Sequence, residues 1–488
     1  MTVIQEDLKL QNVDEQLISD FDKLLPDAWD FKGENVRSLT HGLHNYPATM
    51  VFPIARQLLD MISKYHDVKT LLDPFMGSGT SLVEGYLADL ESVYGTDLNP
   101  LARMMSKVKT TPIDPEELNL EINNLFTNID YNYNLLVSVI VEFDKQIKNE
   151  YDITDKKGWG SEGDQITRKF LKEKNIDMNI PYISNLGYWF LPHVVLELQL
   201  IKNLIKQVES KKIRNFFWVC FSEVVRLSSN RRNGEFKMYR MAKEKLESYS
   251  PNVLQIFMNQ VQKNEEKMKD FYKVSINKQV NTQVNIYNNN AMELNDVPDN
   301  SIDITITSPP YGDSRTTVAY GQFSRTALEW LDLHEDFEDE KAISQKDIRA
   351  IDKKLLGGTV EKKFKYDLSS PTLGDSINKI MEKDEKRALD VYSFYKDLDK
   401  TIEAITRKMK INSYQCWVVG NRTVKEEQLQ THQIIKELGE QYGLVNVAVM
   451  GRNIPNKVMP NLNSPTNKSG QKITTMTNEL IVILRKKR

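Results

Sequence analysis

Two stretches of the chain carry residue types and spacings that could do chemistry. In the first, Asp73-Pro74-Phe75-Met76-Gly77-Ser78-Gly79-Thr80, an apolar β-type run leads into two glycines one residue apart, and a helical pattern follows. A strand, a Gly-x-Gly turn and a helix present backbone N–H groups and a helix N-terminus to a bound ligand. A second β-type run ends in Asp97, at the spacing of a carboxylate that binds a ribose diol. Together they predict half of a nucleoside-binding α/β unit.

The second stretch begins with the β-branched run Ile302 to Ile306 and ends in Thr307-Ser308-Pro309-Pro310-Tyr311. Consecutive prolines end the hydrogen-bond ladder of a strand and fix the backbone. A small polar side chain precedes them and an aromatic ring follows. Because open α/β sheets keep their sites at the carboxyl ends of parallel strands, this stretch predicts a rigid, carbonyl-rich edge beside a flat ring.

Two nucleotide-binding alternatives are excluded by the residues around the glycines. No Gly-Lys-Ser or Gly-Lys-Thr follows them, as a triphosphate-binding P-loop requires. The third glycine of a dinucleotide fingerprint is also absent from the sequence, because position 82 is Leu82.

The two stretches together resemble the amino-group DNA methyltransferases that use S-adenosylmethionine. The first looks like their cofactor motif, and Thr307-Ser308-Pro309-Pro310-Tyr311 looks like their catalytic motif. The similarity extends to His41–Thr49 before the glycines and to Asp97–Ala102 after them. The resemblance implies an α/β fold with a doubly wound, mostly parallel seven-stranded sheet and an inserted, mainly helical domain.

The resemblance also implies the site residues. The cofactor would be S-adenosyl-L-methionine, held by Asp73, Pro74, Phe75, Gly77, Gly79, Thr80, Asp97 and Asn290. Asn290 stands where the family commonly has an acid, and its amide oxygen would accept a hydrogen bond from the adenine amino group without charge. The catalytic residues implied are Ser308, Pro309, Pro310 and Tyr311.

Two features bear on which base is methylated. The Ser-Pro-Pro-Tyr form is associated mainly with cytosine-N4 enzymes, whereas a long insertion between the two motifs is more familiar among adenine-N6 enzymes. We weight the local chemistry above the order and expect a site-specific cytosine-N4 methyltransferase that flips its target out of double-stranded DNA. A restriction–modification system with a cognate endonuclease is expected. The alternatives are adenine-N6 methylation, an RNA amino methyltransferase, and an inactive protein that binds cofactor and recognises DNA.

Breaks in the sequence pattern divide the chain into segments. The cofactor half occupies residues 1–110, a helical insertion 111–280, the catalytic half 281–330, a charged second insertion 331–390, and the rest of the sheet 391–488. The gap at 111–280 far exceeds an ordinary helix-to-strand connection. Asp332 to Glu340 holds six acids, which favours a surface element at 331–390. Residues Gly312 to Arg325 are expected to form a mobile loop over the flipped base.

The helical insertion carries a basic segment. Between Lys211 and Tyr249, ten Lys or Arg stand against four acids, in a chain of net charge −3. Guanidinium groups suit phosphate and guanine, so the segment is expected to contact DNA. The side chains predicted to bind DNA are Arg231, Arg232, Lys237, Arg240 and, beside the catalytic motif, Arg315. The loop Arg452 to Thr477 resembles the target-side loop of the family.

Composition excludes several classes of protein. The 488 residues contain no apolar run long enough to span a membrane, and Met1–Asp7 shows no signal peptide, so a cytoplasmic protein is expected. Two cysteines, Cys220 and Cys416, exclude a disulfide framework and a four-thiolate zinc site, and no metal is expected. Because these cysteines follow Val219 and Gln415 instead of proline, cytosine-C5 methylation is excluded as well.

Overall fold

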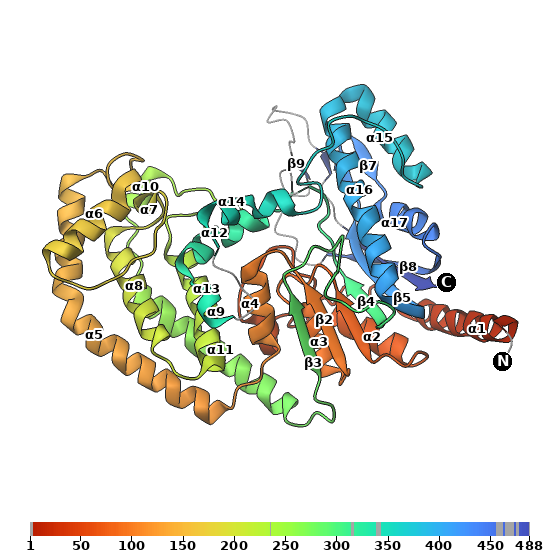
Figure 1. Ribbon diagram of the computed structural model, residues 1–488, viewed down its shortest axis with the longest axis horizontal. Helices are drawn as coiled ribbons and strands as arrows, with labels where there is room; N and C mark the ends of the chain where they lie inside the picture. The colour runs from red at the N-terminus through yellow and green to blue at the C-terminus, as the bar shows by residue number, and fades with distance from the viewer. Residues whose placement is uncertain are drawn as a thin grey trace.

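The computed structural model describes residues 3–234, 236–313, 317–337, 343–454, 462–463, 473–474 and 478–487. They form an α/β lobe built around one large sheet, with a helical lobe beside it (Figure 1). Within these ranges, none of the helices is long and apolar enough to cross a membrane.

The central sheet has seven strands in the order β3-β2-β1-β4-β5-β11-β8. The strands are β1 Thr70–Asp73, β2 Ser92–Thr96, β3 Gln283–Tyr287, β4 Ile302–Thr307, β5 Met409–Gly420, β8 Leu444–Asn453 and β11 Asn478–Lys486. Adjacent strands from β3 to β5 are parallel, whereas β11 runs antiparallel to both of its neighbours. The predicted doubly wound, mostly parallel α/β sheet is therefore confirmed. The strand order reverses between β1 and β4, where such sheets bind their ligands.

Helices on both faces of the sheet cover two apolar cores. These helices are α1 Val3–Asp22, α2 Phe52–Ser63, α3 Thr80–Leu87, α16 Glu385–Lys408 and α17 Thr431–Glu440, whereas α4 Pro100–Lys109 packs into the core of the helical lobe. Because successive side chains of a strand point to opposite faces, Leu71 packs in the core with α2 and Leu72 in the core with α16 and α17. Adjacent residues of β1 therefore pack into cores on opposite faces of the sheet.

The helical lobe is formed by the described residues between α4 and β3. Its helices are α5 Pro115–Glu150, α6 Trp159–Glu173, α7 Leu186–Trp189, α8 Pro192–Lys206, α9 Lys211–Ser228, α10 Lys243–Glu247 and α11 Val253–Ser275. The helix α9 lies inside this lobe and contacts α4, α8 and α11, so most of its side chains are buried, polar ones such as Glu223 included. The predicted helical insertion thus packs directly against the cofactor half of the sheet.

Two segments expected to be irregular or exposed are partly helical. A helix, α12 (Tyr320–Trp330), begins inside the predicted mobile loop, because Phe323, Ala327 and Trp330 lie at helical spacing and pack into the core of the helical lobe. The expectation of a surface element at residues 331–390 is also wrong in part. This segment contains α14 (Gln345–Lys354) and α15 (Pro371–Lys383), and the apolar side of α15 lies in the core shared with α16.

Short elements complete the described chain. They are η1 Leu39–Gly42, α13 Leu333–Asp336, β6 Arg422–Val424, β7 Glu427–Leu429, β9 Leu462–Asn463 and β10 Ile473–Thr474.

Candidate active site

A cavity opens at the carboxyl ends of β1, β2 and β4. It holds about 840 Å³ of atom-free space, part of it open to solvent. Gly77 lines one part of it, and Ser308 and Pro310 line another. The two stretches that carry the candidate chemistry therefore meet in one cavity.

Asp73 ties the two stretches together. It ends β1, and its buried Oδ1 accepts hydrogen bonds from Thr307 Oγ1 of β4 at 2.7 Å and from Phe75 N at 3.1 Å. Burial raises the pKa of the Asp73 carboxyl to about 6. This expected cofactor residue thus lines the cavity and also fixes the relative position of two strand ends.

The two glycines of the turn are required for different reasons. Gly77 has a φ of +48° and lines the cavity, where an added Cβ would lie 3.3 Å from Tyr46 Cε1. Gly79 has a φ of +81° at the N-cap of α3, and an added Cβ would lie 2.7 Å from Ser106 Oγ of α4. Both positions favour glycine, because other residues rarely adopt a positive φ. Gly77 keeps room in the cavity, whereas Gly79 lets α3 approach α4.

Asp97 closes the turn from the next strand. Its Oδ2 accepts a hydrogen bond from Gly77 N at 3.1 Å, and its Oδ1 accepts one from Asn99 N at 2.8 Å. Burial raises the pKa of the Asp97 carboxyl to about 6. Asn290 also lines the cavity, and its Oδ1 accepts from Met292 N at 3.0 Å. The other expected cofactor residues on the cavity wall are Pro74, Phe75 and Thr80.

Two further wall residues, Tyr46 and Asn99, lie in the segments to which the family resemblance extends but were not assigned to the cofactor site from the sequence. Asn99 caps α4 through Leu101 N, and its Nδ2 donates to Tyr46 Oη at 3.1 Å and to Ser324 Oγ at 2.7 Å. Tyr46 in turn packs against Tyr320, with ring centroids 5.9 Å apart, and both tyrosines line the cavity. The Asn-Pro start of α4 is a capping signal that could have drawn attention to Asn99.

A further part of the wall comes from the segment expected to lie on the surface. Lys354, Leu355 and Leu356, at the end of α14, line the same cavity. Leu356 is buried, in the core shared with α16. No signal in the sequence marks these residues, because the charged segment around them lies outside the motifs.

The catalytic motif meets a partner from the far end of the chain. Tyr311 Oη donates a hydrogen bond to Glu479 Oε1 of β11 at 2.9 Å, and Ser308 Oγ lies 3.4 Å from Tyr311 Oη. Pro309 is buried beside them. No pattern in the sequence singles out Glu479, which lies 168 residues after Tyr311.

The predicted DNA-binding residues separate into two groups. Arg231 is fully buried and donates to the backbone oxygens of Phe323 and Phe236, at 3.2 Å each. Arg240 donates to Ile153 O at 2.8 Å and lies over the ring of Tyr188. Both guanidinium groups bond within the protein, which argues against the expected DNA contacts.

The other residues predicted to bind DNA either reach the surface or lie outside the described residues. Arg232 is exposed and Lys237 is half-buried, so their side chains reach the surface of the helical lobe. Arg315 lies outside the described residues, as does most of the loop Arg452 to Thr477. Arg452 and Asn453 belong to β8 instead of a loop, and Arg452 is buried.

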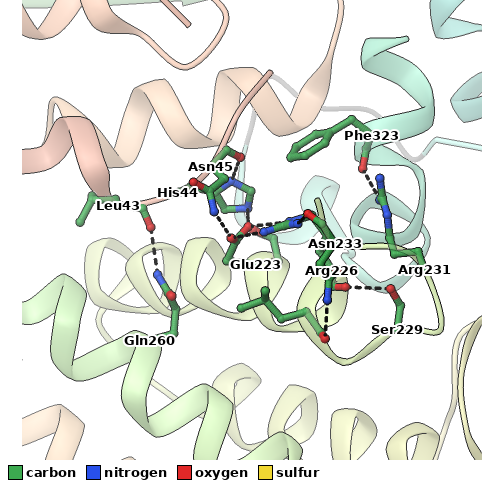
Figure 2. Close-up of polar contacts among 12 residues, drawn as sticks. Leu43, His44, Asn45, Glu223, Arg226, Ser229, Arg231, Asn233, Gln260 and Phe323 are labelled. Atoms are coloured by element: carbon green, nitrogen blue, oxygen red, sulfur yellow. Dashed lines mark hydrogen bonds and ion pairs between the residues drawn. The ribbon is translucent and has the colours of Figure 1, made fainter. Parts of the chain in front are cut away.

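A buried polar network joins the helical lobe to the chain beside the cavity (Figure 2). Glu223 of α9 accepts a hydrogen bond from Asn45 Nδ2 at 2.7 Å and pairs with Arg226 at 2.5 Å, and His44 Nε2 lies 3.4 Å from its other oxygen. Burial alone would raise the pKa of Glu223, but His44 and Arg226 hold it below its usual value. Because Tyr46 directly follows Asn45, α9 anchors the chain next to the cavity wall.

Comparison with known proteins places the whole chain beside named relatives. No family model matches it. It is 42% identical over 496 residues to the Type II methyltransferase M.MvaI of Kocuria varians, an alignment that covers 98% of each chain. It is also 25% identical over 228 residues to the Type II methyltransferase M.MjaII of Methanocaldococcus jannaschii, covering 41% of this chain and 42% of that one. The first similarity therefore includes the helical insertion as well as the two motifs.

Proposed function

The chain belongs to the type II methyltransferase family, and on this premise we propose that it methylates the exocyclic N4 amino group of cytosine at a specific site in double-stranded DNA. The methyl donor is S-adenosyl-L-methionine. The observation that carries the proposal is the shared cavity, which is lined both by Gly77 of the cofactor motif and by Ser308 and Pro310 of the catalytic motif.

The residues around Gly77 fit the donor. The Asp97 carboxylate follows β2, where it suits the two hydroxyls of a ribose, and Asn290 offers an amide at the end of β3 for the adenine. The open space that Gly77 preserves against Tyr46 would be filled in part by any larger residue. When bound, the donor supplies a methyl group on a positively charged sulfur, which a nucleophile displaces in line.

The residues of the catalytic motif would prepare the nucleophile. The lone pair of the cytosine amino group is delocalised into the ring, so the free amine is a weak nucleophile. Ser308 Oγ and the carbonyl of Pro309 would accept hydrogen bonds from its two hydrogens, draw the nitrogen toward tetrahedral geometry and stabilise the positive charge that develops there. The methylated nitrogen becomes acidic and loses one of these protons after the transfer, so no strong general base is needed. The ring of Tyr311 would stack on the base. Because the amino group is inaccessible inside a duplex, the base must be flipped into the cavity.

Adenine-N6 methylation is the second candidate, because the helical lobe is inserted between the cofactor motif and the catalytic motif. The Ser308 hydroxyl supports cytosine instead, through the resemblance to Ser-Pro-Pro-Tyr enzymes. Duplex DNA treated with the enzyme and isotope-labelled S-adenosylmethionine, digested to nucleosides and analysed by mass spectrometry, separates the two. N4-methylcytosine is the expected product. N6-methyladenine alone would overturn the base assignment, and labelling of bulk RNA but not DNA would overturn the substrate class.

The sequence context of the reaction is testable in a host that expresses the chain. Sequencing that detects modified bases would report one short methylated sequence motif if the enzyme is site-specific. We place the enzyme in a restriction–modification system, so DNA modified by it should resist a cognate restriction endonuclease that cuts unmodified DNA at the same motif. Methylation scattered over many unrelated sequences would contradict site specificity.

A further inference from the structure

The target side of the cavity has an acidic partner on the last strand of the sheet. Glu479 stands near the start of β11, directly opposite Arg452 of β8. One carboxylate oxygen accepts from Tyr311 Oη at 2.9 Å, and the other pairs with Arg452 Nη1 at 2.9 Å. Exposure is 16% for the Glu479 side chain and 4% for that of Arg452, so water competes little for these bonds.

The charge of this pair fixes the direction of the hydrogen bonds. A carboxylate paired with an arginine accepts hydrogen bonds and donates none. The Tyr311 hydroxyl must therefore give its single hydrogen to Glu479. The phenol oxygen is then left as an acceptor, and the hydroxyl that faces it is that of Ser308.

Because the Tyr311 oxygen can only accept, the Ser308 hydroxyl must donate to it. Its hydrogen points at Tyr311, so the lone pairs of Ser308 Oγ are left for the cavity that Ser308 lines. The distance of 3.4 Å between the two hydroxyl oxygens is long, and catalytic hydrogen bonds of this kind commonly shorten when the substrate is bound.

We propose that Glu479 is a positioning residue that orients the hydroxyls of Tyr311 and Ser308, so that Ser308 meets the target amino group as a hydrogen-bond acceptor. The inference rests on the proposed amino-group methylation, but it holds for cytosine or adenine. A serine hydroxyl can either donate or accept, and without a fixed partner it could turn its hydrogen toward the amine. Glu479 removes that choice without touching the substrate.

The substitution Glu479→Gln tests this polarity directly. Beside Arg452, the amide oxygen of glutamine faces the guanidinium and its NH₂ faces Tyr311. The hydrogen bonds then reverse, and the Ser308 hydrogen is turned into the cavity against the amino hydrogens. We expect the single-turnover methylation rate to fall roughly 100-fold, with the Kd for S-adenosylhomocysteine and for DNA unchanged.

A double-mutant cycle distinguishes polarity from structural support. Tyr311→Phe keeps the ring but removes the hydroxyl, which frees Ser308 to rotate, and a loss of about tenfold is expected. The double variant Glu479→Gln with Tyr311→Phe should be no slower than Tyr311→Phe alone, because residue 479 no longer reaches Ser308. Losses that multiply instead would overturn the inference, as would full activity of Glu479→Gln.

Arg452→Lys is the matched control for the ion pair. It keeps a positive charge beside Glu479, so the carboxylate still accepts from Tyr311, and the methylation rate should stay within a few-fold of wild type. If Glu479→Gln fails to fold, Arg452→Lys and Tyr311→Phe still test the inference, since equal losses of rate in both would contradict the proposed order of effects. If the wild-type enzyme methylates no nucleic acid, the proposed function is wrong. That result is distinct from a failure of the Glu479 inference, which requires an active wild-type enzyme.

Discussion

Asn45 donates a side-chain hydrogen bond to Glu223 at 2.7 Å, although the two residues lie 178 positions apart. One belongs to the segment that leads into the cavity wall, and the other to a helix of the inserted lobe. Tyr46, the next residue, lies next to Gly77, and both line the cavity. The inserted lobe therefore helps to hold the pocket that we assign to the methyl donor.

Glu223→Gln should weaken both the fold and the donor site. Arg226 would keep its buried charge without its carboxylate partner, which lowers the free energy of unfolding by about 3 kcal/mol. With the anchor of Asn45 weakened, the Kd for S-adenosylhomocysteine should rise about tenfold. Thermal unfolding and calorimetric titration measure the two effects. Glu266→Gln, at an exposed position on α11, is the control and should change neither, and an unaltered Kd in Glu223→Gln would refute the link.

The variants Arg231→Ala and Arg232→Ala should differ in their effects on stability and on DNA binding. Arg231→Ala removes a buried side chain that bonds to Phe323 O, so it should lower the melting temperature. Arg232→Ala, at an exposed position, should lower the melting temperature less than Arg231→Ala does and should weaken duplex binding, with the salt dependence of log K reduced by about one unit. Binding titrations at several salt concentrations make the comparison. Equal DNA affinity in wild type and Arg232→Ala would exclude a phosphate contact there.

The two glycines should separate stability from donor binding. Gly79→Ala must adopt a strained φ and push against Ser106 of α4, so it should lower the free energy of unfolding by about 2 kcal/mol or more. Gly77→Ala has a milder backbone penalty but places a methyl group in the cavity beside Tyr46, so it should mainly raise the KM for S-adenosylmethionine. Thermal unfolding and steady-state kinetics of both variants test this. The reverse ranking would show that the roles of the two glycines are exchanged.

Donor affinity should depend on pH through Asp97. Its pKa is raised to about 6 by burial, so the protonated form is favoured by the fold, and the carboxylate that suits a ribose diol predominates only above pH 6. The Kd for S-adenosylhomocysteine should therefore rise by up to about tenfold for each pH unit below 6. Calorimetric titration between pH 5 and pH 8 measures it, and a flat profile in the wild type would contradict the assignment.

The raised pKa of Asp97 gives folding stability the opposite pH dependence to donor affinity. Because the folded-state pKa lies above the unfolded value, the contribution of Asp97 to stability is largest at low pH and is lost as pH rises through about 6. Asp97→Asn should bind the donor more weakly but with little pH dependence. A slope that persists in Asp97→Asn would assign the titration to Asp73, whose pKa is also raised to about 6.

Local chemistry made the strand ends predictable. Closely spaced glycines and paired prolines are recognised from a few consecutive residues. The turn at Gly77 and the strand end at Pro309 could therefore be placed on a sheet from the sequence. The doubly wound, mostly parallel sheet of seven strands followed from the resemblance, and the structure confirms it. What the residues do in the cavity stays a prediction.

Contacts that depend on packing could not be read in this way. Arg231 and Arg232 have the same charge and adjacent positions, and only the fold buries one and exposes the other. Glu479 reaches Tyr311 because β11 inserts between β5 and β8, which no local pattern reveals. The segment ending in Leu356 looked like an acidic surface, yet its apolar end closes the cavity.

The helical lobe leaves the sheet after α4 and returns at β3, the terminal strand of the sheet. Insertions or deletions within the lobe therefore shift no strand that lies between two others. Over evolutionary time such a lobe can vary in length and in its exposed loops, and under our proposal that it contacts DNA, this variation would change the DNA preference more readily than the donor site. The surface of α9 that carries Glu223 should be the slowest part of the lobe to diverge.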